Sequence, residues 1–254
     1  VSDMYSKDNK FVTNRPLVAN CSLDSGEMLL VGVHSDTDVA CIINKYGYDN
    51  SLIAGDNSSS TTSFDKYCQI NISPMGINGQ LGSGFIDSSV KYYTVEIDGL
   101  DITFKVNLIC DREFTPVPLH FVNQYGMFDT ARFGLVSRLT MDIERKGFKQ
   151  REYSFGATSV DYYDANGVYR ESKINYAQKA EHSYKLTMDA PTDAEYEWLA
   201  ELFMSPQIYA QIDGYYYPVT IKNTNYEYSK YLFNRLKALE VDIELNQTRY
   251  AHAR

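Results

Sequence analysis

The sequence predicts a mainly β fold, made of β-sandwich or tube-like β-barrel units with one flanking α-helix at about residues 193–204. Two patterns predict it: apolar and polar residues alternate in many short segments, and a single segment carries both the start signal and the apolar stripe of a helix. Aromatic residues make up 14% of the 254 residues, and hydrophobic residues make up 44%. A chain this rich in aromatic residues folds around a core and is not disordered.

The first half contains four strand-like segments, at residues 28–33, 39–43, 92–97 and 102–106. Long turn-rich stretches separate them. The polar stretch 55–63 and the stretch 74–84, which contains four glycines, are both expected to be surface loops. These glycines lack the spacing Gly-x-Gly-x-x-Gly, and no amphipathic helix follows them, so we do not expect a phosphate-binding loop.

Pro116 and Pro118 lie between the two halves of the chain. Proline disfavours the continuation of a central strand and stiffens a connector. We therefore predict a boundary near Pro118. Residues 1–118 would form a strand-rich domain with long loops, and residues 119–254 would form a second β domain with one helix.

The second half shows the clearest alternation. At 239–245, four aliphatic residues alternate with three acidic ones, so a strand there places aliphatic side chains on one face and carboxylates on the other. The same alternation recurs around 139–143, 184–188, 208–212 and 217–221. Within 160–169, the dipeptide Asn166–Gly167 tolerates positive φ and predicts the tip of a hairpin.

One helix is predicted, from about Asp193 to Met204. Thr192 and Glu195 have the spacing of a capping box, in which each side chain bonds the backbone N–H of the other residue. Apolar residues then fall on one helical stripe that includes Trp198, the only Trp of the chain. We expect Trp198 to anchor the helix to the sheet.

No motif for catalysis or metal binding is found in the sequence. The cysteines are Cys21, Cys41, Cys68 and Cys110, and the histidines are His34, His120, His182 and His252. Neither set has the paired spacing of a metal site, and no Gly-x-Ser-x-Gly segment marks a nucleophile. We expect free thiols, no metal, no cofactor and no catalytic residue, and we predict that the protein is not an enzyme.

The charge balance is acidic, with 24 Lys and Arg against 33 Asp and Glu and a formal net charge of −9. A broad phosphate-binding face gains its affinity from clustered Lys and Arg, and this composition argues against one. No apolar run approaches the roughly 18 residues of a membrane span. We therefore expect a soluble protein with no specific nucleic-acid site and no membrane partner.

Tyrosines cluster toward the C-terminus, at Tyr215, Tyr216 and Tyr217 and then at Tyr226, Tyr228 and Tyr231. Rings with a polar tip can stack on sugars or pack at a subunit interface. They also suit a strand whose alternate tyrosines line the core. The sequence leaves these three interpretations open.

Five segments of the second half resemble the tail structural proteins of tailed bacteriophages and related prophages, especially those of the distal tail and baseplate. The segments are FVNQYGMFDT at 121–130, LAELFMSPQIY at 199–209, YPVTI at 217–221, NTNYEY at 223–228 and LEVDIEL at 239–245. Their order is similar to that of the family. The resemblance covers residues 119–247, and the first half is similar only in being a strand-rich domain that precedes them.

This resemblance implies a structural virion protein that forms a ring or collar in the distal tail, baseplate or tail hub. It implies a fold similar to that of the tail tube, in which a β-barrel or sandwich with one helix repeats around an axis. Its partners would be identical subunits and neighbouring tail proteins, around a channel through which DNA can pass. It would be made in the host bacterial cytoplasm and reside in the virion tail. We expect Tyr125, Phe128, Tyr215 and Tyr216 to lie near subunit contacts.

The alternative function is a carbohydrate-binding or adhesion module of a phage or bacterial surface, because tyrosines on a strand-rich scaffold suit sugar binding. A glycoside hydrolase is a more distant third possibility, since among 33 acidic residues some pair falls at the required distance by chance. A monomer that binds glycans would favour the adhesion module. A closed oligomer without glycan affinity would favour the tail ring.

Overall fold

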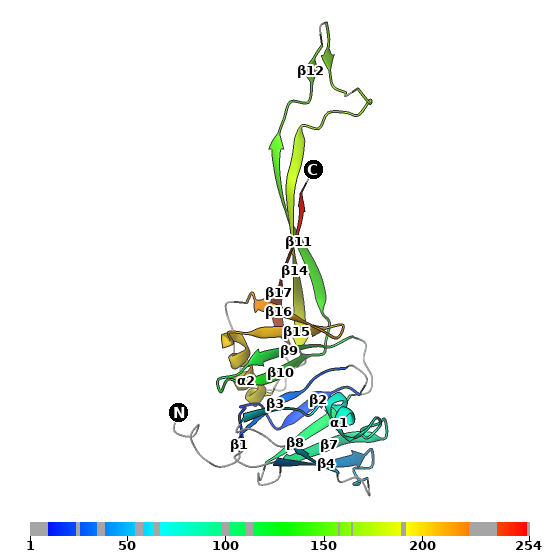
Figure 1. The fold of residues 1–254 in the computed structure, drawn as a ribbon, viewed down its shortest axis with the longest axis vertical. Helices are drawn as coiled ribbons and strands as arrows, with labels where there is room; N and C mark the ends of the chain where they lie inside the picture. Colours follow the sequence, from blue (N-terminus) through cyan, green and yellow to red (C-terminus); the bar gives the residue numbers. More distant parts are fainter. Residues whose placement is uncertain are drawn as a thin grey trace.

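A computed structural model of the chain describes residues 10–23, 26–34, 39–53, 58–62, 67–97, 102–109, 114–156, 158–163, 165–188, 192–223 and 238–252. These residues form a broad base and a long, narrow extension that rises from it (Figure 1). The base contains all of the N-terminal half that is described, together with helix α2 and the lower part of a large sheet.

Two sheets form the N-terminal part of the base. The smaller has the order β1 (Lys10–Phe11), β3 (Leu30–His34), β6 (Tyr67–Asn71), and the larger has the order β2 (Val18–Cys21), β8 (Thr103–Leu108), β7 (Val90–Ile97), β4 (Val39–Gly47), β5 (Ser58–Thr62). Buried side chains from both sheets share one core cluster, which includes Val31, Tyr93 and Phe104. The two sheets therefore pack face to face as a sandwich.

The C-terminal half forms a seven-stranded antiparallel sheet. Its order is β10 (Phe128–Phe133), β9 (Val117–Val122), β15 (Ile208–Ile212), β16 (Tyr215–Ile221), β17 (Leu239–His252), β14 (Lys173–Met188), β11 (Arg138–Lys149). Helix α2 (Asp193–Met204) packs on this sheet, because Trp198 and Leu202 share a core cluster with Phe121 and Ile243. The predicted class is confirmed: the fold is mainly β and sandwich-like, and none of the described sheets closes into a barrel.

The helix predicted at 193–204 is confirmed with the same bounds. The Thr192 hydroxyl accepts a hydrogen bond from the Glu195 N–H at 3.3 Å, and the Glu195 carboxylate accepts one from the Thr192 N–H at 2.7 Å. Two otherwise unpaired donors of the first turn are thereby satisfied. Trp198 is buried in the core, as predicted.

A second helix, α1 (Pro74–Leu81), occupies most of the stretch that was expected to be a loop. The expectation is wrong because the glycines do not prevent a helix that has a strong start signal. The Ser73 hydroxyl accepts a hydrogen bond from the Gly76 N–H at 3.1 Å, and Pro74 fills the first helical position. A Cβ on Gly76 would lie 2.5 Å from the carbonyl oxygen of Asn71. Glycine is therefore required here by a close approach, not by a mobile loop.

Two other expectations also fail in part. Residues 58–62, inside the stretch read as a loop, form the edge strand β5 paired with β4. Pro118 lies within β9, opposite Arg132 of β10, and not in a connector. Its missing N–H is tolerated there because β15, the other neighbour of β9, pairs only with residues 119–121. Within the described ranges, none of the sheets contains strands from both sides of residues 110–116. The division into two domains near Pro118 stays a prediction.

Candidate assembly surface

Two long strands carry the chain out of the base and back again. β11 pairs with β14 along its whole length, from Arg138 opposite Lys185 to Lys149 opposite Lys173. At a typical rise per residue, the 12 residues of β11 span about 40 Å. We call residues 138–182 the arm; in Figure 1 it rises from the base to the label β12.

One face of the arm carries an apolar stripe, formed by Leu139, Met141 and Ile143. Alternate residues of a strand point to the same face, so the three side chains lie on one side of β11. They are 57%, 51% and 40% exposed. The sequence predicted a half-buried strand here; the strand is present, but its apolar residues are not covered, because the core cluster beneath α2 does not extend to them.

This stripe continues the core face of the seven-stranded sheet. Leu139 lies opposite Tyr184 of β14, and Tyr184 packs against the core cluster to which its near neighbour Leu186 belongs. The same sheet face is therefore buried within the base and exposed on the arm. An apolar face that continues a core and has no cover is typical of a docking surface.

The two edges of the seven-stranded sheet differ. At β10, the Gln69 carboxamide accepts from the Phe128 N–H at 2.9 Å and donates to the Phe128 carbonyl at 2.7 Å, while Arg15 donates to the Thr130 carbonyl at 2.9 Å. Side chains of the N-terminal half thus bond the backbone groups of that edge. At β11, the opposite edge, no described strand pairs with the outer side. An open edge presents unpaired N–H and C=O groups to another chain.

The tip of the arm is forked and aromatic. One branch is the hairpin β12 (Ser154–Phe155) and β13 (Val160–Asp161), and the other is closed by a bridge between Tyr163 and Tyr169 (Figure 1). Gly167 turns the second branch with φ of +77°, which confirms the turn expected at Asn166–Gly167. Tyr153, Phe155, Tyr162, Tyr163 and Tyr169 are 37% to 70% exposed, and neighbouring ring centroids in this set lie 5.3–6.4 Å apart. We call these five residues the tip cluster.

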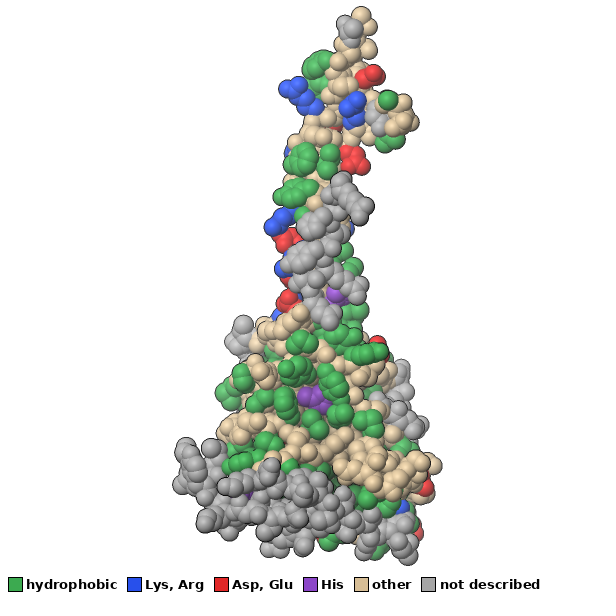
Figure 2. Space-filling model, viewed as in Figure 1, with side chains coloured by type: hydrophobic (Ala, Val, Ile, Leu, Met, Phe, Trp, Pro, Cys, Tyr) green, Lys and Arg blue, Asp and Glu red, His purple; other side chains and the backbone are tan. Residues whose placement is uncertain are grey.

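Exposed apolar side chains are concentrated on the arm. Half of the large hydrophobic side chains that the described residues expose lie between positions 139 and 176. Figure 2 shows them along the arm, with Lys, Arg, Asp and Glu side chains between them. The arm is therefore neither a purely apolar nor a purely charged surface.

The four residues that the sequence placed at subunit contacts are not gathered on the arm. The Tyr125 hydroxyl donates to the Asn14 side chain at 3.2 Å, and the Tyr216 hydroxyl lies 2.9 Å from the sulfur of Met28. Phe128 bonds Gln69 through its backbone, as described above. Three of the four thus contact the N-terminal half of their own chain, and Tyr125, Tyr215 and Tyr216 are all exposed. Their role at subunit contacts stays a prediction.

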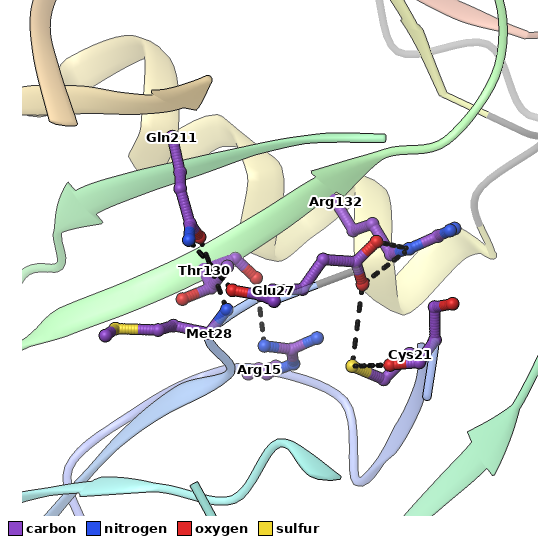
Figure 3. A network of polar contacts seen from close by, with 9 residues as sticks. Arg15, Cys21, Glu27, Met28, Thr130, Arg132 and Gln211 are labelled. Carbon is purple, nitrogen blue, oxygen red and sulfur yellow. Dashed lines mark hydrogen bonds and ion pairs between the residues drawn. The ribbon is translucent and has the colours of Figure 1, made fainter. Parts of the chain in front are cut away.

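A network of polar contacts joins the two halves of the base (Figure 3). Arg132 of β10 forms an ion pair with the buried Glu27 at 3.1 Å, and Gln211 of β15 donates to the Gly26 carbonyl at 2.9 Å. Asp129 is buried, accepts hydrogen bonds from Thr13 at 2.7 Å and Trp198 at 3.0 Å, and has a pKa raised by that burial. Truncating either end of such a network leaves a buried polar group unpaired. The base is therefore held together as one support for the arm.

Cys21 contacts Glu27 in this network, but its environment does not activate it as a nucleophile. Burial, together with the adjacent Glu27 carboxylate, raises the pKa of its thiol to about 12. The thiolate is the reactive form of cysteine. At neutral pH this side chain is therefore a protonated, inert thiol. Cys41 and Cys68 are also free thiols, and burial raises the pKa of both.

His120 makes the stability of the base sensitive to pH. Burial lowers the pKa of His120 from 6.5 to about 4. The Thr130 hydroxyl lies 2.9 Å from its Nδ1, and the side chains of Gln211 and Tyr216 also face the ring. Between pH 6.5 and about 4 the unfolded chain protonates this histidine and the folded chain does not. We therefore expect the free energy of unfolding to fall by roughly 1.4 kcal/mol for each pH unit across this window.

The measurement is urea unfolding of the wild type and of His120→Gln at pH 7 and pH 4.5. The buried Asp129 acts with the opposite sign, because its pKa is raised and protonation favours the folded state, so the difference between the two proteins isolates His120. We expect a smaller loss of stability on acidification in the variant. Equal losses in both proteins would show that His120 does not contribute.

The described residues contain no group of three or more His, Cys, Asp or Glu side chains placed to hold a metal ion. None of the helices in the described ranges is both long and apolar enough to cross a membrane. Cys110, Asp164, Tyr226, Tyr228, Tyr231 and the side chain of His252 lie outside the described residues.

Comparison with known proteins finds no family model, no curated protein and no solved structure that matches this chain.

Proposed function

We propose that this protein is a structural subunit of a bacteriophage tail, and that it self-associates through its arm into a ring or collar. The single observation that carries this proposal is the arm itself, a projection with an open strand edge and a bare apolar stripe. Sequence alternation along the arm and the resemblance of residues 119–247 to tail structural proteins supply the rest of the support.

An arm of this kind favours a permanent partner over a free monomer. Soluble proteins normally block or shorten exposed strand edges, as Gln69 and Arg15 block β10 in this chain. β11 has 12 residues and no described partner on its outer side. With Leu139, Met141 and Ile143 also exposed, the arm would be an aggregation hazard unless another molecule covers it.

The topology of the arm favours a ring. β16 pairs with β17 only at residues 243–245, so residues 246–252 of β17 have β14 on one side and no described strand on the other. The arm and the end of β17 therefore form a three-stranded ribbon, with one open edge at β11 and another at the end of β17. If the β11 edge of one copy meets the β17 edge of the next, the contact is heterologous, and repeating it about an axis closes a ring.

The remaining features of the proposal follow from the resemblance. The ring would belong to the distal tail, baseplate or hub, contact identical subunits and neighbouring tail proteins, and surround a channel for DNA. The protein would act as a scaffold and not as an enzyme. It would be made in the host bacterial cytoplasm and be carried in the virion tail.

The second candidate is a carbohydrate-binding module, and the exposed tip cluster is the observation that favours it. Aromatic rings that bind sugars offer an open face for stacking. In the tip cluster, Tyr153 and Phe155 meet edge to face at 82°, as do Tyr163 and Tyr169 at 82°. Rings engaged with each other in this way are less suited to a flat sugar platform than to a protein contact.

The experiment that separates the two candidates is light scattering of the purified full chain over a hundredfold range of concentration, with a glycan-binding panel on the same sample. We expect a concentration-dependent oligomer of a single defined size, and no glycan binding. A protein that stays monomeric over the whole range would overturn the ring. A monomer that binds a glycan would establish the alternative.

A further inference from the structure

The proposed pairing of strand edges between copies does not involve the tip cluster. β12 and β13 form a separate two-stranded sheet that is not part of the seven-stranded sheet. Edge-to-edge pairing of arms therefore does not bury the five aromatic side chains. At 37% to 70% exposure, and with roughly 150–250 Å² per aromatic side chain, they present about 500 Å² of surface. This equals the largest apolar patch of a typical monomer, which is commonly a binding site.

The chain cannot cover this patch with its own base. β11 alone holds the tip about 40 Å from the base. The base ends of β11 and β14 are fixed in the seven-stranded sheet by continuous pairing, from Arg138–Lys185 onward. The described residues of the base therefore do not cover the tip, and we look for its cover in another molecule.

If the ring forms, it places a second copy beside each tip cluster, and that copy can cover it. Arms that run side by side around an axis bring all tips to the same height, so each tip lies beside the tips of its neighbours. One branch of the fork continues along the arm, whereas the segment between β13 and β14 turns aside from it (Figure 1). Once the arms of two copies are paired, each tip is held at a high effective concentration near the neighbouring tip, which favours a contact between them.

The chemistry of the tip suits contact with an identical tip. Residues 150–172 combine five aromatic residues with three Ser, two Gly and one Asn, a composition typical of adaptable protein-recognition loops. Tyrosine supplies a large contact area at a small cost in side-chain entropy. Charges of both signs occur, for example Arg151 beside Glu152 and Arg170 beside Glu171. Residues 150–172 carry two arginines and four carboxylates, so identical tips can approach where an arginine of one copy faces a carboxylate of the other.

We propose that the tip cluster is an aromatic clasp between neighbouring copies, in which the branch bearing Tyr163 and Tyr169 packs against the branch bearing Tyr153 and Phe155 of the next copy. This rests on the proposed ring. The clasp locks the free ends of the arms, which edge pairing near the base leaves unsupported.

The first test is the stability of the ring on dilution, measured by mass photometry. The variant combines Phe155→Ser, Tyr163→Ser and Tyr169→Ser, and the matched control is Tyr48→Ser, an exposed tyrosine of the base. We expect the triple variant to fold normally and to form rings, but to dissociate at a protein concentration at least about tenfold higher than the wild type. The control should dissociate like the wild type.

The second test is photo-oxidative tyrosine cross-linking of rings assembled from mixed ¹⁴N- and ¹⁵N-labelled chains, followed by mass spectrometry. We expect mixed-isotope cross-links between Tyr153 and Tyr163 or Tyr169. Rings that form normally, but give no such cross-links and are unaffected by the triple substitution, would overturn the clasp and leave the ring standing. Cross-links from the tip to a base residue such as Tyr48 would replace the clasp with end-to-end stacking. Absence of any ring in the wild type would overturn both proposals.

Discussion

Trp198→Ala is expected to lower the free energy of unfolding by about 3–5 kcal/mol. Trp198 is buried, its ring centroid lies 5.5 Å from that of Phe121, and its indole N–H donates to Asp129 at 3.0 Å. The Arg15 guanidinium carbon lies 5.1 Å from the ring centroid. Truncation leaves a large cavity and removes one donor from a buried carboxylate.

Urea unfolding followed by far-ultraviolet circular dichroism measures this effect without using tryptophan fluorescence. Met204→Ala is the matched control, because Met204 ends the same helix but is exposed. Its expected effect is within about 0.5 kcal/mol. A Trp198→Ala effect as small as that of the control would show that α2 does not dock on the sheet.

Met141→Lys is expected to weaken self-association by about 30-fold or more while leaving the fold intact. The stripe lies on β11, the strand at which the next copy would pair, and placing an ammonium group at that contact costs at least about 2 kcal/mol. The monomer is unaffected because Met141 is half exposed and belongs to neither of the two large core clusters.

Thr140→Lys is the matched control for this prediction. It adds the same charge one residue away on the opposite face of β11. The measurement is the oligomer fraction against concentration for both variants, with thermal melting to confirm the fold. If Met141→Lys associates as strongly as Thr140→Lys, the apolar stripe does not lie in the subunit contact.

Local signals decided which elements could be predicted from the sequence. The bounds of α2 were predicted because Thr192, Glu195 and the apolar stripe are all encoded within the helix itself. Ser73 and Pro74 carry the same kind of start signal for α1, but the glycines that follow are typical of a loop and argue against a helix. One of them, Gly76, is required because the Asn71 backbone approaches it closely. β5 was missed because its five residues, SSSTT, have no apolar alternation and are held by pairing with β4.

The arm was missed for a different reason. Period-two alternation at 139–143 predicts a strand with one apolar face, but it does not say which molecule covers that face. The sequence also does not predict that Gln69 blocks one sheet edge while β11 remains open, because Gln69 and its partner Phe128 lie 59 residues apart in the chain. The tyrosines expected at subunit contacts, such as Tyr216, contact their own N-terminal half. The tip tyrosines at 153–169 follow no simple period that would assign them a role.

The most direct test of the central claim is an electron-microscopy map of the assembled particle, or of the purified protein at assembly concentration. We expect a closed ring of this chain around a channel, with the arms side by side and β11 of each copy next to the end of β17 of the following copy. A map in which the chain is absent from the tail, or is a monomer whose arm touches no copy of itself, would contradict it.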